Sequence, residues 1–508
     1  MICTVNMLNG VSDSYIQMDK LDQLFEYFPT VRLIQTDVSD KLVDVLKGYP
    51  YDEQEPGVYF VSPQGAGNKS GDSWDNAMDM DQWRTMVSSS SGAKTYSQSA
   101  MLDNSTFHFM EGTYCVPSSE SGICRVEFQE YGQECGVTIL GGYDSSSTGT
   151  DLSKRNPDVN ITEFTGDLNA NGKADTEDAG IFCLDAFAYL KVSGVTFAHS
   201  YGRSRWDQKA FILNTSVSGA RARVDLADCR FHDIYGYKDT ETKYHGGAAV
   251  WVGKNALATL NRCEMSDCHS HSRGGAIRVA ESSGIVFLNE CILRENVLKD
   301  RFGSAVHVTA GSFLANNCTF AHNIGSHAVL NGGGNWLLVN STVVADYVSS
   351  LSDSNMVWRS ESGTDRTAAM VNSILLFDGY TSVYINGSSY SMTSLGYNLT
   401  GANNQYFTPS DKDLTGCTAS GLGLTWSDDG YYQWNGAVSG FTKATLTDVE
   451  DAVKTGCSRS AGPYSNIGQG FYDWLQEIGG GKNPLAYDQA GNSRNPDAVW
   501  PGSYERQK

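Results

Sequence analysis

A short pattern of polar, small, variable and large apolar residues returns along the chain at intervals of 23 to 34 residues. One example is ANNCTFAHN at residues 315–323, in which Phe320 follows Cys318 two positions later. Alternation with a period of two is typical of a β-strand that buries one face. Repeats of this length with one short strand each predict a solenoid. The small residues of the six segments are Cys229, Cys263, Cys291, Cys318, Ser341 and Ser373, and the large ones are Phe231, Met265, Leu293, Phe320, Val343 and Leu375.

A second apolar segment returns in step with the first. It reads GGAAVWV, GGAIRVA, GSAVHVT and GSHAVLN, beginning at residues 246, 274, 303 and 325. No helical period lies between the two kinds of segment, so each repeat consists of strands joined by bends rich in glycine, asparagine and serine. This arrangement predicts a parallel β-helix, in which equivalent residues of neighbouring coils stack about 4.8 Å apart. We expect the cysteines and serines to form an interior ladder, with Asp228, Arg262 and Glu290 facing outwards beside it.

The sequence changes character on both sides of residues 56–399, which are predicted to form the coil. Residues 1–55 contain helical spacing around 17–28 and 39–48 and a strand-like segment at 30–36. We expect them to form a small α/β cap or an attachment segment, because a solenoid needs its apolar ends covered. Residues 400–508 are expected to end the coil and form an irregular C-terminal cap. That cap should include a short helix in FYDWLQEIGGG (471–481), which ends at glycine.

Composition narrows the range of functions. The 53 glycines against 11 prolines suit tight bends between short strands. A net charge of −21 argues against a nucleic-acid partner, because contact with a phosphate backbone needs concentrated lysine and arginine. No apolar run approaches the roughly 18 residues of a membrane-spanning helix. The start MICTVNMLNG has no basic and apolar signal segment, so such a signal was removed or the protein reaches its place by another route.

The 12 cysteines raise the question of disulfides and metal. Stacked side chains of one ladder point the same way, so we expect the four ladder cysteines to be free and buried. Cys115, Cys124 and Cys135 lie in turn-rich sequence and are better candidates for one bridge. Zinc is not expected, because the chain has no pair of cysteines separated by two residues.

Several motifs follow one another in an order typical of one protein family. They are GVYFVSPQGAGNKSGDSWDNAM (57–78), FHFMEGTY (107–114), LGGYDSSSTGTDLSKRNP (140–157), ITEFTGDLNANGK (161–173) and QAGNSRNPDAVWPGSYE (489–505). This succession resembles the right-handed parallel β-helix surface proteins of gut Bacteroidetes, which belong to the pectin-lyase-like superfamily and carry polymorphic-outer-membrane-type repeats. The resemblance implies the fold. Relatives with this architecture include polysaccharide lyases, glycoside hydrolases, adhesins and phage tailspikes. No lyase motif matches residue by residue, so the resemblance assigns no catalytic residue.

The segment DLNANGKADTED at residues 167–178 has the spacing of a twelve-residue calcium loop. Oxygen ligands at alternate positions can surround one ion, and Gly172 at the sixth position permits the sharp turn. Position twelve is the shorter Asp rather than Glu, and an Asx-rich turn without metal explains the same residues. A structural Ca²⁺ and a metal-free turn both stay open. The candidate ligands are Asp167, Asn169, Asn171, Lys173 through its carbonyl, Asp175 and Asp178.

Basic and imidazole side chains gather around the second strand of the repeat. If Ile277 and Val279 point inwards, Arg278 points outwards, and His307 takes the equivalent position one coil later. In an acidic protein this patch is a candidate for glycan contact. A polysaccharide lyase also needs a cation to neutralise a uronate carboxylate and a base to abstract the neighbouring proton. The alternative is a set of solvated residues that pair with Asp233, Asp267, Glu281 and Glu295. The other members of the patch are Lys243, Tyr244, His245, Arg273, Arg301 and His327.

Three functions fit these observations, because a fold by itself does not determine function. The function that requires the fewest special sequence features is that of an extracellular or cell-surface protein that binds an extended polysaccharide or surface glycan without cleaving it. The second is a polysaccharide lyase or glycosidase on the same scaffold. The third is a phage tailspike or fibre component, which would be trimeric and would belong to the virion.

Overall fold

The computed structural model describes residues 56–503 except for fifteen short gaps. The chain divides into two compact units, Met1–Glu55 and Pro56–Lys508, and every described residue belongs to the second. The helices and strand expected within residues 1–55 therefore lie outside the described residues. The gaps are 90–93, 95, 120–122, 129–134, 203–209, 237–245, 272, 299–302, 326–327, 346–355, 361–366, 378–391, 402–406, 428–430 and 435–439.

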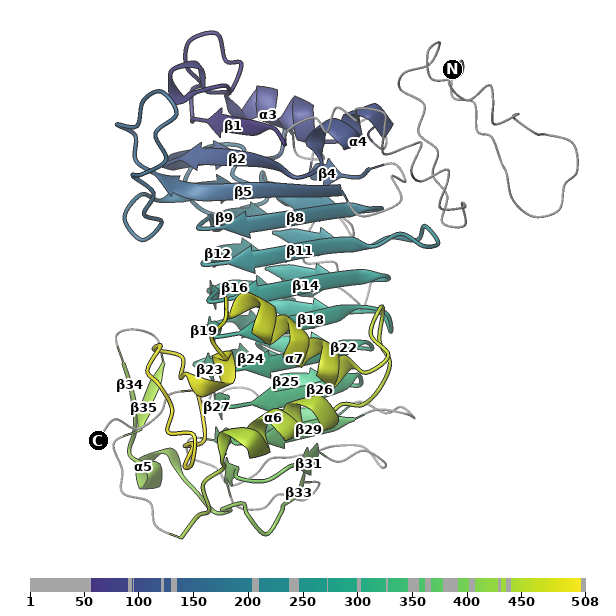
Figure 1. Ribbon diagram of the computed structural model, residues 1–508, viewed down its shortest axis with the longest axis vertical. Helices are drawn as coiled ribbons and strands as arrows, with labels where there is room; N and C mark the ends of the chain where they lie inside the picture. Colours follow the sequence, from purple (N-terminus) through teal and green to yellow (C-terminus); the bar gives the residue numbers. More distant parts are fainter. Residues whose placement is uncertain are drawn as a thin grey trace, which may run out of the picture. The chain divides into compact units, whose positions relative to one another are not determined.

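Within the described residues, three long sheets of parallel strands wind around a common interior (Figure 1). The predicted parallel β-helix, an all-β solenoid, is thereby confirmed. The first sheet has 12 strands, in the order β1 (Val58–Val61), β2 (Ser105–Met110), β5 (Cys135–Tyr143), β8 (Ala188–Ser193), β11 (Ala222–Ala227), β14 (Ala256–Asn261), β18 (Ile285–Asn289), β22 (Ser312–Asn316), β26 (Asn335–Val339), β29 (Ala368–Val371), β31 (Met392–Ser394) and β33 (Phe407–Thr408).

The other two sheets complete each coil. The second has eight described strands: β4 (Cys124–Val126), β7 (Phe182–Leu184), β10 (Phe211–Leu213), β13 (Val250–Val252), β17 (Ile277–Val279), β21 (Val306–Val308), β25 (Ala328–Gly332) and β28 (Met356–Ser360). The third has 13 described strands: β3 (Gly112–Cys115), β6 (Thr162–Thr165), β9 (Thr196–Tyr201), β12 (Arg230–Tyr235), β15 (Glu264–Ser266), β16 (Cys268–Ser270), β19 (Ile292–Arg294), β20 (Val297–Leu298), β23 (Thr319–Ala321), β24 (Ile324–Gly325), β27 (Thr342–Ala345), β30 (Ile374–Phe377) and β32 (Leu399–Thr400).

The predicted interior ladder is present, but it lies at a corner of the coil. Cys229 stands between β11 and β12, and the residue before it, Asp228, has a φ of 54°. Left-handed backbone of this kind turns the chain, and among residues other than glycine it is least costly for Asn and Asp. The strand that we expected to be centred on each small residue is therefore interrupted there. All six small residues are at most 2% exposed, and so are the six large ones beside them.

The column of polar residues that precedes the ladder is only partly exposed. Arg262 and Asp228 face outwards, as predicted, and pair at 2.7 Å between Nε and Oδ1. Asn317 and Asn372, at the same position of later coils, are fully buried. The reason is the C-terminal segment: Asn317 Nδ2 donates to the carbonyl of Tyr487, and Asn372 Nδ2 donates to that of Trp500.

The bridge expected among Cys115, Cys124 and Cys135 is wrong, because all three are free thiols in the structure. Their sulfurs are buried or half-buried, and burial raises the pKa of Cys124 to about 12. The four ladder cysteines are also free, as predicted.

Helices cover one end and one face of the coil. Helix α3 (Met80–Val87) places the fully buried Trp83 against Phe107 and Phe109, and it thereby closes the interior next to the first coils; the short helices η2 (Trp74–Asn76) and α4 (Tyr96–Leu102) lie nearby in the sequence. Helices α6 (Leu446–Thr455) and α7 (Ile467–Ile478) lie across the outer face of the first sheet (Figure 1). The C-terminal part also contains α5 (Ala419–Leu422), β34 (Leu424–Trp426), β35 (Tyr432–Trp434) and η3 (Pro484–Ala486).

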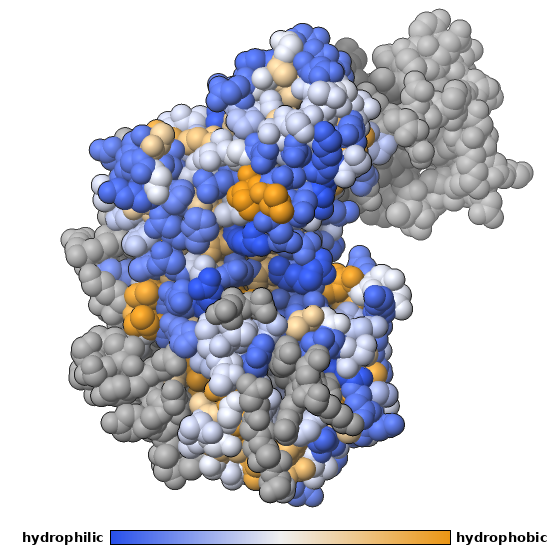
Figure 2. Space-filling model, turned by 90° about the vertical axis from the view of Figure 1, so that its left-hand side faces the viewer, coloured by the Kyte–Doolittle hydropathy of each residue, from blue (hydrophilic) through white to orange (hydrophobic). Residues whose placement is uncertain are grey.

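The outward residues of the first sheet explain where α6 and α7 dock. In the later coils they are apolar. Phe287, Leu314 and Leu337 belong to one buried cluster with Phe471 and Trp474 of α7 and with residues of α6. Helix α7 was predicted as a short helix ending at glycine, and Gly479 is its C-cap. In the earlier coils the outward residues are polar. The surface that Figure 2 shows is mostly hydrophilic, with hydrophobic residues in small separate patches.

Candidate functional site

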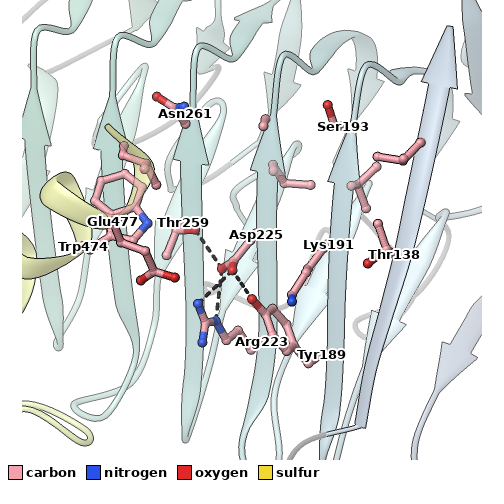
Figure 3. Close-up of a pocket in the computed structure, with 15 residues that line it drawn as sticks. Thr138, Tyr189, Lys191, Ser193, Arg223, Asp225, Thr259, Asn261, Trp474 and Glu477 are labelled. Carbon is pink, nitrogen blue, oxygen red and sulfur yellow. Dashed lines mark hydrogen bonds and ion pairs between the residues drawn. The ribbon is translucent and has the colours of Figure 1, made fainter. Parts of the chain in front are cut away.

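A groove lies on the outer face of the first sheet, at the place where the cover of α7 ends (Figure 3). Its volume is about 290 Å³. Parallel pairing in register places Thr138, Lys191, Asp225 and Thr259 in one row across β5, β8, β11 and β14. Each side chain of the row is one strand spacing, about 4.8 Å, from the next. Trp474, Glu477 and Ile478 of α7 line the groove opposite.

Asp225 is the centre of a hydrogen-bond network in the groove. Arg223 Nη2 and Nε donate to its two oxygens at 2.8 and 3.1 Å, and Thr259 Oγ1 donates at 2.8 Å. The Tyr189 hydroxyl donates to the same carboxylate. Four donors hold the carboxylate in one orientation, and a charge-assisted network of this kind is rigid. The groove therefore has a preformed polar floor.

Tyr189 is held by both of its neighbours. The Arg223 guanidinium lies 4.3 Å from the centroid of the Tyr189 ring, a cation–π contact. Burial and the Asp225 carboxylate raise the pKa of Tyr189 well above its usual value. Its hydroxyl therefore stays protonated at neutral pH and acts as a hydrogen-bond donor.

The mouth of the groove carries one exposed cation and an exposed carboxylate. Lys191 is exposed, with its Nζ 4.9 Å from the Tyr189 ring centroid. Glu477 is exposed on α7, three residues after Trp474. Trp474 itself is only 6% exposed and packs on Phe287 at 5.6 Å between ring centroids. The site thus combines an apolar wall, hydroxyl and amide groups and fixed charges, a combination typical of ligand sites with a few orienting polar groups.

The carboxyl and phenol groups at the floor of the groove are engaged in hydrogen bonds. Glycoside hydrolysis uses two carboxyl groups, one as acid and the other as base or nucleophile. In this groove Asp225 already accepts hydrogen bonds from three side chains. Tyr189, protonated at neutral pH, is a poor base for a lyase reaction. The fixed groups can instead orient the hydroxyl groups of a bound molecule.

The predicted basic patch has a different structure from the one expected. Arg278 on β17 and His307 on β21 are register neighbours, as predicted. Their expected exposure is wrong: Arg278 is 5% exposed and His307 is fully buried. Glycine-rich bends lie close against the outer face of these strands. A Cβ atom added to Gly247, for example, would lie 2.8 Å from the Cβ of Arg278.

Of the remaining members of the patch, the structure describes Arg273. His307 Nδ1 lies 3.3 Å from Thr309 Oγ1, and Arg273 is half-buried. Asp233 pairs with His199, Asp267 with His269 and Glu295 with Arg294. The other candidates, Lys243, Tyr244, His245, Arg301 and His327, lie outside the described residues.

The candidate calcium loop, residues 167–178, folds around its own backbone. Asp167 accepts the N–H groups of Asn171 and Gly172 at 3.2 and 2.7 Å, and Asp178 accepts those of Leu168 and Asp175 at 3.2 and 2.7 Å. Asp178 is fully buried, and this burial, with the nearby carboxylates of Asp175 and Asp167, raises its pKa to about 6.

The donor set of this loop neither establishes nor removes a metal site. Asn169 and Asn171 turn their amide nitrogens towards Asp175. Over the part of the chain that the structure describes, no group of three or more His, Cys, Asp or Glu side chains could hold a metal ion. Partly buried carboxylates that lie close together repel one another, and a bound hard cation such as Ca²⁺ reduces this repulsion. Calcium in this loop stays a prediction from the sequence.

Reasoning from the sequence missed the groove. Its residues come from strands about one coil apart and from a helix more than 200 residues later, and no local motif joins them. One signal was available: β11 and the residues before it read RARVDLAD, in which Arg221, Arg223 and Asp225 alternate with apolar residues. Charged side chains at alternate positions of a solenoid strand indicate its outer face.

No family model and no curated protein matches the chain. Among solved structures it is similar to pectate lyase Pel9A, with 10% identity, a TM-score of 0.42 and coverage of 89% of this chain and 96% of that one. A pectin methylesterase from Aspergillus niger gives 12% identity, a TM-score of 0.25 and coverage of 77% and 93%. A mutant of the PL6 family alginate lyase AlyGC gives 11%, 0.22, and 65% and 52%.

The strand pairing described above, independently of these similarities, defines the chain as a parallel β-helix protein. The resemblance to surface proteins of gut Bacteroidetes, including their repeat type, remains a prediction from the sequence. No helix among the described residues is long and apolar enough to cross a membrane.

Proposed function

We propose that this β-helix protein binds an extended glycan in the groove beside α7 and does not cleave it. The observation that carries the proposal is the row of Thr138, Lys191, Asp225 and Thr259 facing the Trp474 side of α7. A sugar ring has hydroxyl groups at its edge and apolar C–H faces. Fixed acceptors and donors beside the half-buried apolar side chains of Leu140 and Ile478 match both features.

The two alternatives from the sequence make different demands on the structure. A lyase or glycosidase needs a group that can take up or deliver a proton. Asp225 is engaged in hydrogen bonds, so this role in the groove would fall to the exposed Lys191 or Glu477. A tailspike or fibre component would bind glycan as well, but as a trimer. An extracellular, cell-surface or virion location suits all three functions, because the polymers that they recognise occur there.

A glycan panel tests the proposal. Calorimetry or array binding with plant, algal and bacterial polysaccharides should identify at least one ligand. Lys191→Ala should weaken its binding about tenfold, because a charge-assisted hydrogen bond contributes about 1.5–3 kcal/mol and roughly 1.4 kcal/mol corresponds to tenfold. Tyr189→Phe should weaken it less, since the ring remains.

A matched control exists in the same molecule. Lys454 lies over the Tyr472 ring at 4.2 Å, on helices α6 and α7, and lines no part of the groove. Lys454→Ala should leave binding unchanged. Failure of every polysaccharide to bind would refute the proposal. An unsaturated product, detected by its ultraviolet absorbance, would show that the protein is a lyase instead, and a trimeric mass in solution would favour the tailspike.

A further inference from the structure

A second hollow lies on the same sheet face, at the opposite ends of the same strands. Its volume is about 200 Å³, and Arg221, Asn255 and Ser283 line it at the starts of β11, β14 and β18. Gly462 and Pro463 from the segment between α6 and α7 form its other side. The groove beside α7 is lined by later residues of β11 and β14.

The two hollows are neighbours along each strand. Arg221 lines the second hollow and Arg223 lines the groove, two residues further on. On β14, Leu257 lines the second hollow and Thr259 lines the groove. Two residues of a strand span about 6.6 Å, so the lining of one hollow passes directly into that of the other.

One wall serves both hollows. This wall is the segment from α6 to α7, residues 446–478, which lies across the first sheet. It contains Gly462, Pro463, Trp474 and Glu477. Gly462 permits close approach to β18, because a Cβ atom there would lie 2.8 Å from Ile285 Cδ1. Gly462 and Pro463 lie beside the start of β14, and Trp474 and Glu477 lie beside its end. From Arg221 to Ala227 the floor extends about 20 Å at roughly 3.3 Å per residue.

We infer that the two hollows form one groove across the coil and that its ligand is a linear oligosaccharide segment that occupies both. The inference rests on the proposed function. Arg221, Asn255 and Ser283 supply hydrogen-bonding groups at one end, and Lys191, Asp225 and Thr259 supply them at the other. A chain bound along the strands presents its interior units to the protein, so the length of the chain matters more than its ends.

The experiment measures affinity against ligand length. Linear cello-, xylo- and galacturonate oligosaccharides, from disaccharide to hexasaccharide, are titrated into the full chain by calorimetry. Affinity should rise at least tenfold from disaccharide to hexasaccharide. Two variants address the second hollow: Arg221→Ala removes its cation, and Pro463→Trp fills it from an exposed position. Pro496→Trp is the matched control, because Pro496 is an exposed proline of the C-terminal part that lines neither hollow.

The expected pattern separates this inference from the proposed function. Pro463→Trp and Arg221→Ala should lower hexasaccharide affinity about tenfold and leave disaccharide affinity unchanged, whereas Lys191→Ala should lower both. Equal affinity for all lengths, or a Pro463→Trp variant that binds hexasaccharide like the wild type, would overturn the inference while glycan binding stands. If the wild type binds none of these series and no polysaccharide of the panel, the proposed function fails, and the inference fails with it.

Discussion

We predict from the interior ladder that Cys291→Ser is almost neutral, although it places a hydroxyl at a fully buried position. Two later rungs already show how serine fits. Ser341 Oγ donates to the carbonyl of Val339 at 2.8 Å and accepts the N–H of Cys318 at 3.2 Å. Cys291 Sγ has equivalent neighbours, since it lies 3.3 Å from the carbonyl of Asn289.

The magnitude follows from these contacts. A serine at 291 would donate to Asn289 and accept from Cys263, and each such bond contributes about 0.5–1.5 kcal/mol. The lost burial of the larger thiol costs about 1 kcal/mol. The net change should therefore lie within about 1 kcal/mol. Cys291→Leu adds atoms between rungs about 4.8 Å apart, and overpacking of this kind costs about 1–3 kcal/mol.

Urea unfolding followed by tryptophan fluorescence measures both variants against the wild type. The expected order of stability is wild type, serine variant, leucine variant, with the first two close together. A serine variant destabilised by more than about 3 kcal/mol, far beyond the net change expected when two hydrogen bonds form, would refute this account of the ladder. So would a leucine variant as stable as the wild type.

Three further predictions follow from the described residues. Burial and, to a smaller degree, Arg155 lower the pKa of His108 from 6.5 to about 4; stability should therefore fall by about 3 kcal/mol as the pH drops from 7 to 4, because the unfolded chain takes up the proton first. His108→Asn should flatten this dependence in urea titrations at several pH values, and an unchanged slope would contradict it. Gly274→Ala should cost more than about 2 kcal/mol, because φ is +71° and a Cβ atom would lie 2.2 Å from the carbonyl oxygen of Ile277. Gly149→Ala is its control, with φ +56° and nothing within 4 Å, and equal losses would show that the clash is irrelevant. Calcium added to the metal-free protein should release heat in calorimetry if the loop at 167–178 binds it as the sequence predicts, and Asp167→Ala should abolish that heat; a silent titration ends the prediction.

Much of the fold was predictable because a strand alternates its side chains with a period of two. Phe231, Met265 and Leu293 could be placed inside from their spacing alone, and Cys229 and Cys263 could be stacked because the repeat brings them to the same position of each coil. The corner at Asp228 was less accessible. Its left-handed backbone interrupts a pattern that reads as one continuous strand.

The candidate site was less predictable for a physical reason. Periodicity tells which side chains leave the interior, but it does not tell what covers them afterwards. Arg278 and Asp225 both point away from the interior. The first is buried under a glycine-rich bend, whereas the second lies in a groove.

The sequence by itself determined the repeating strands and the interior ladder, because both depend on local periodicity and on stacking between equivalent positions. It also determined a short helix that ends at glycine near residue 479, because that depends on local residues alone. Only the tertiary structure decided which part of the outer face stays accessible. That choice depends on where the edge of α7, with Trp474 and Glu477, meets β8, β11 and β14. Contacts between segments more than 200 residues apart set this edge, and no local pattern encodes them.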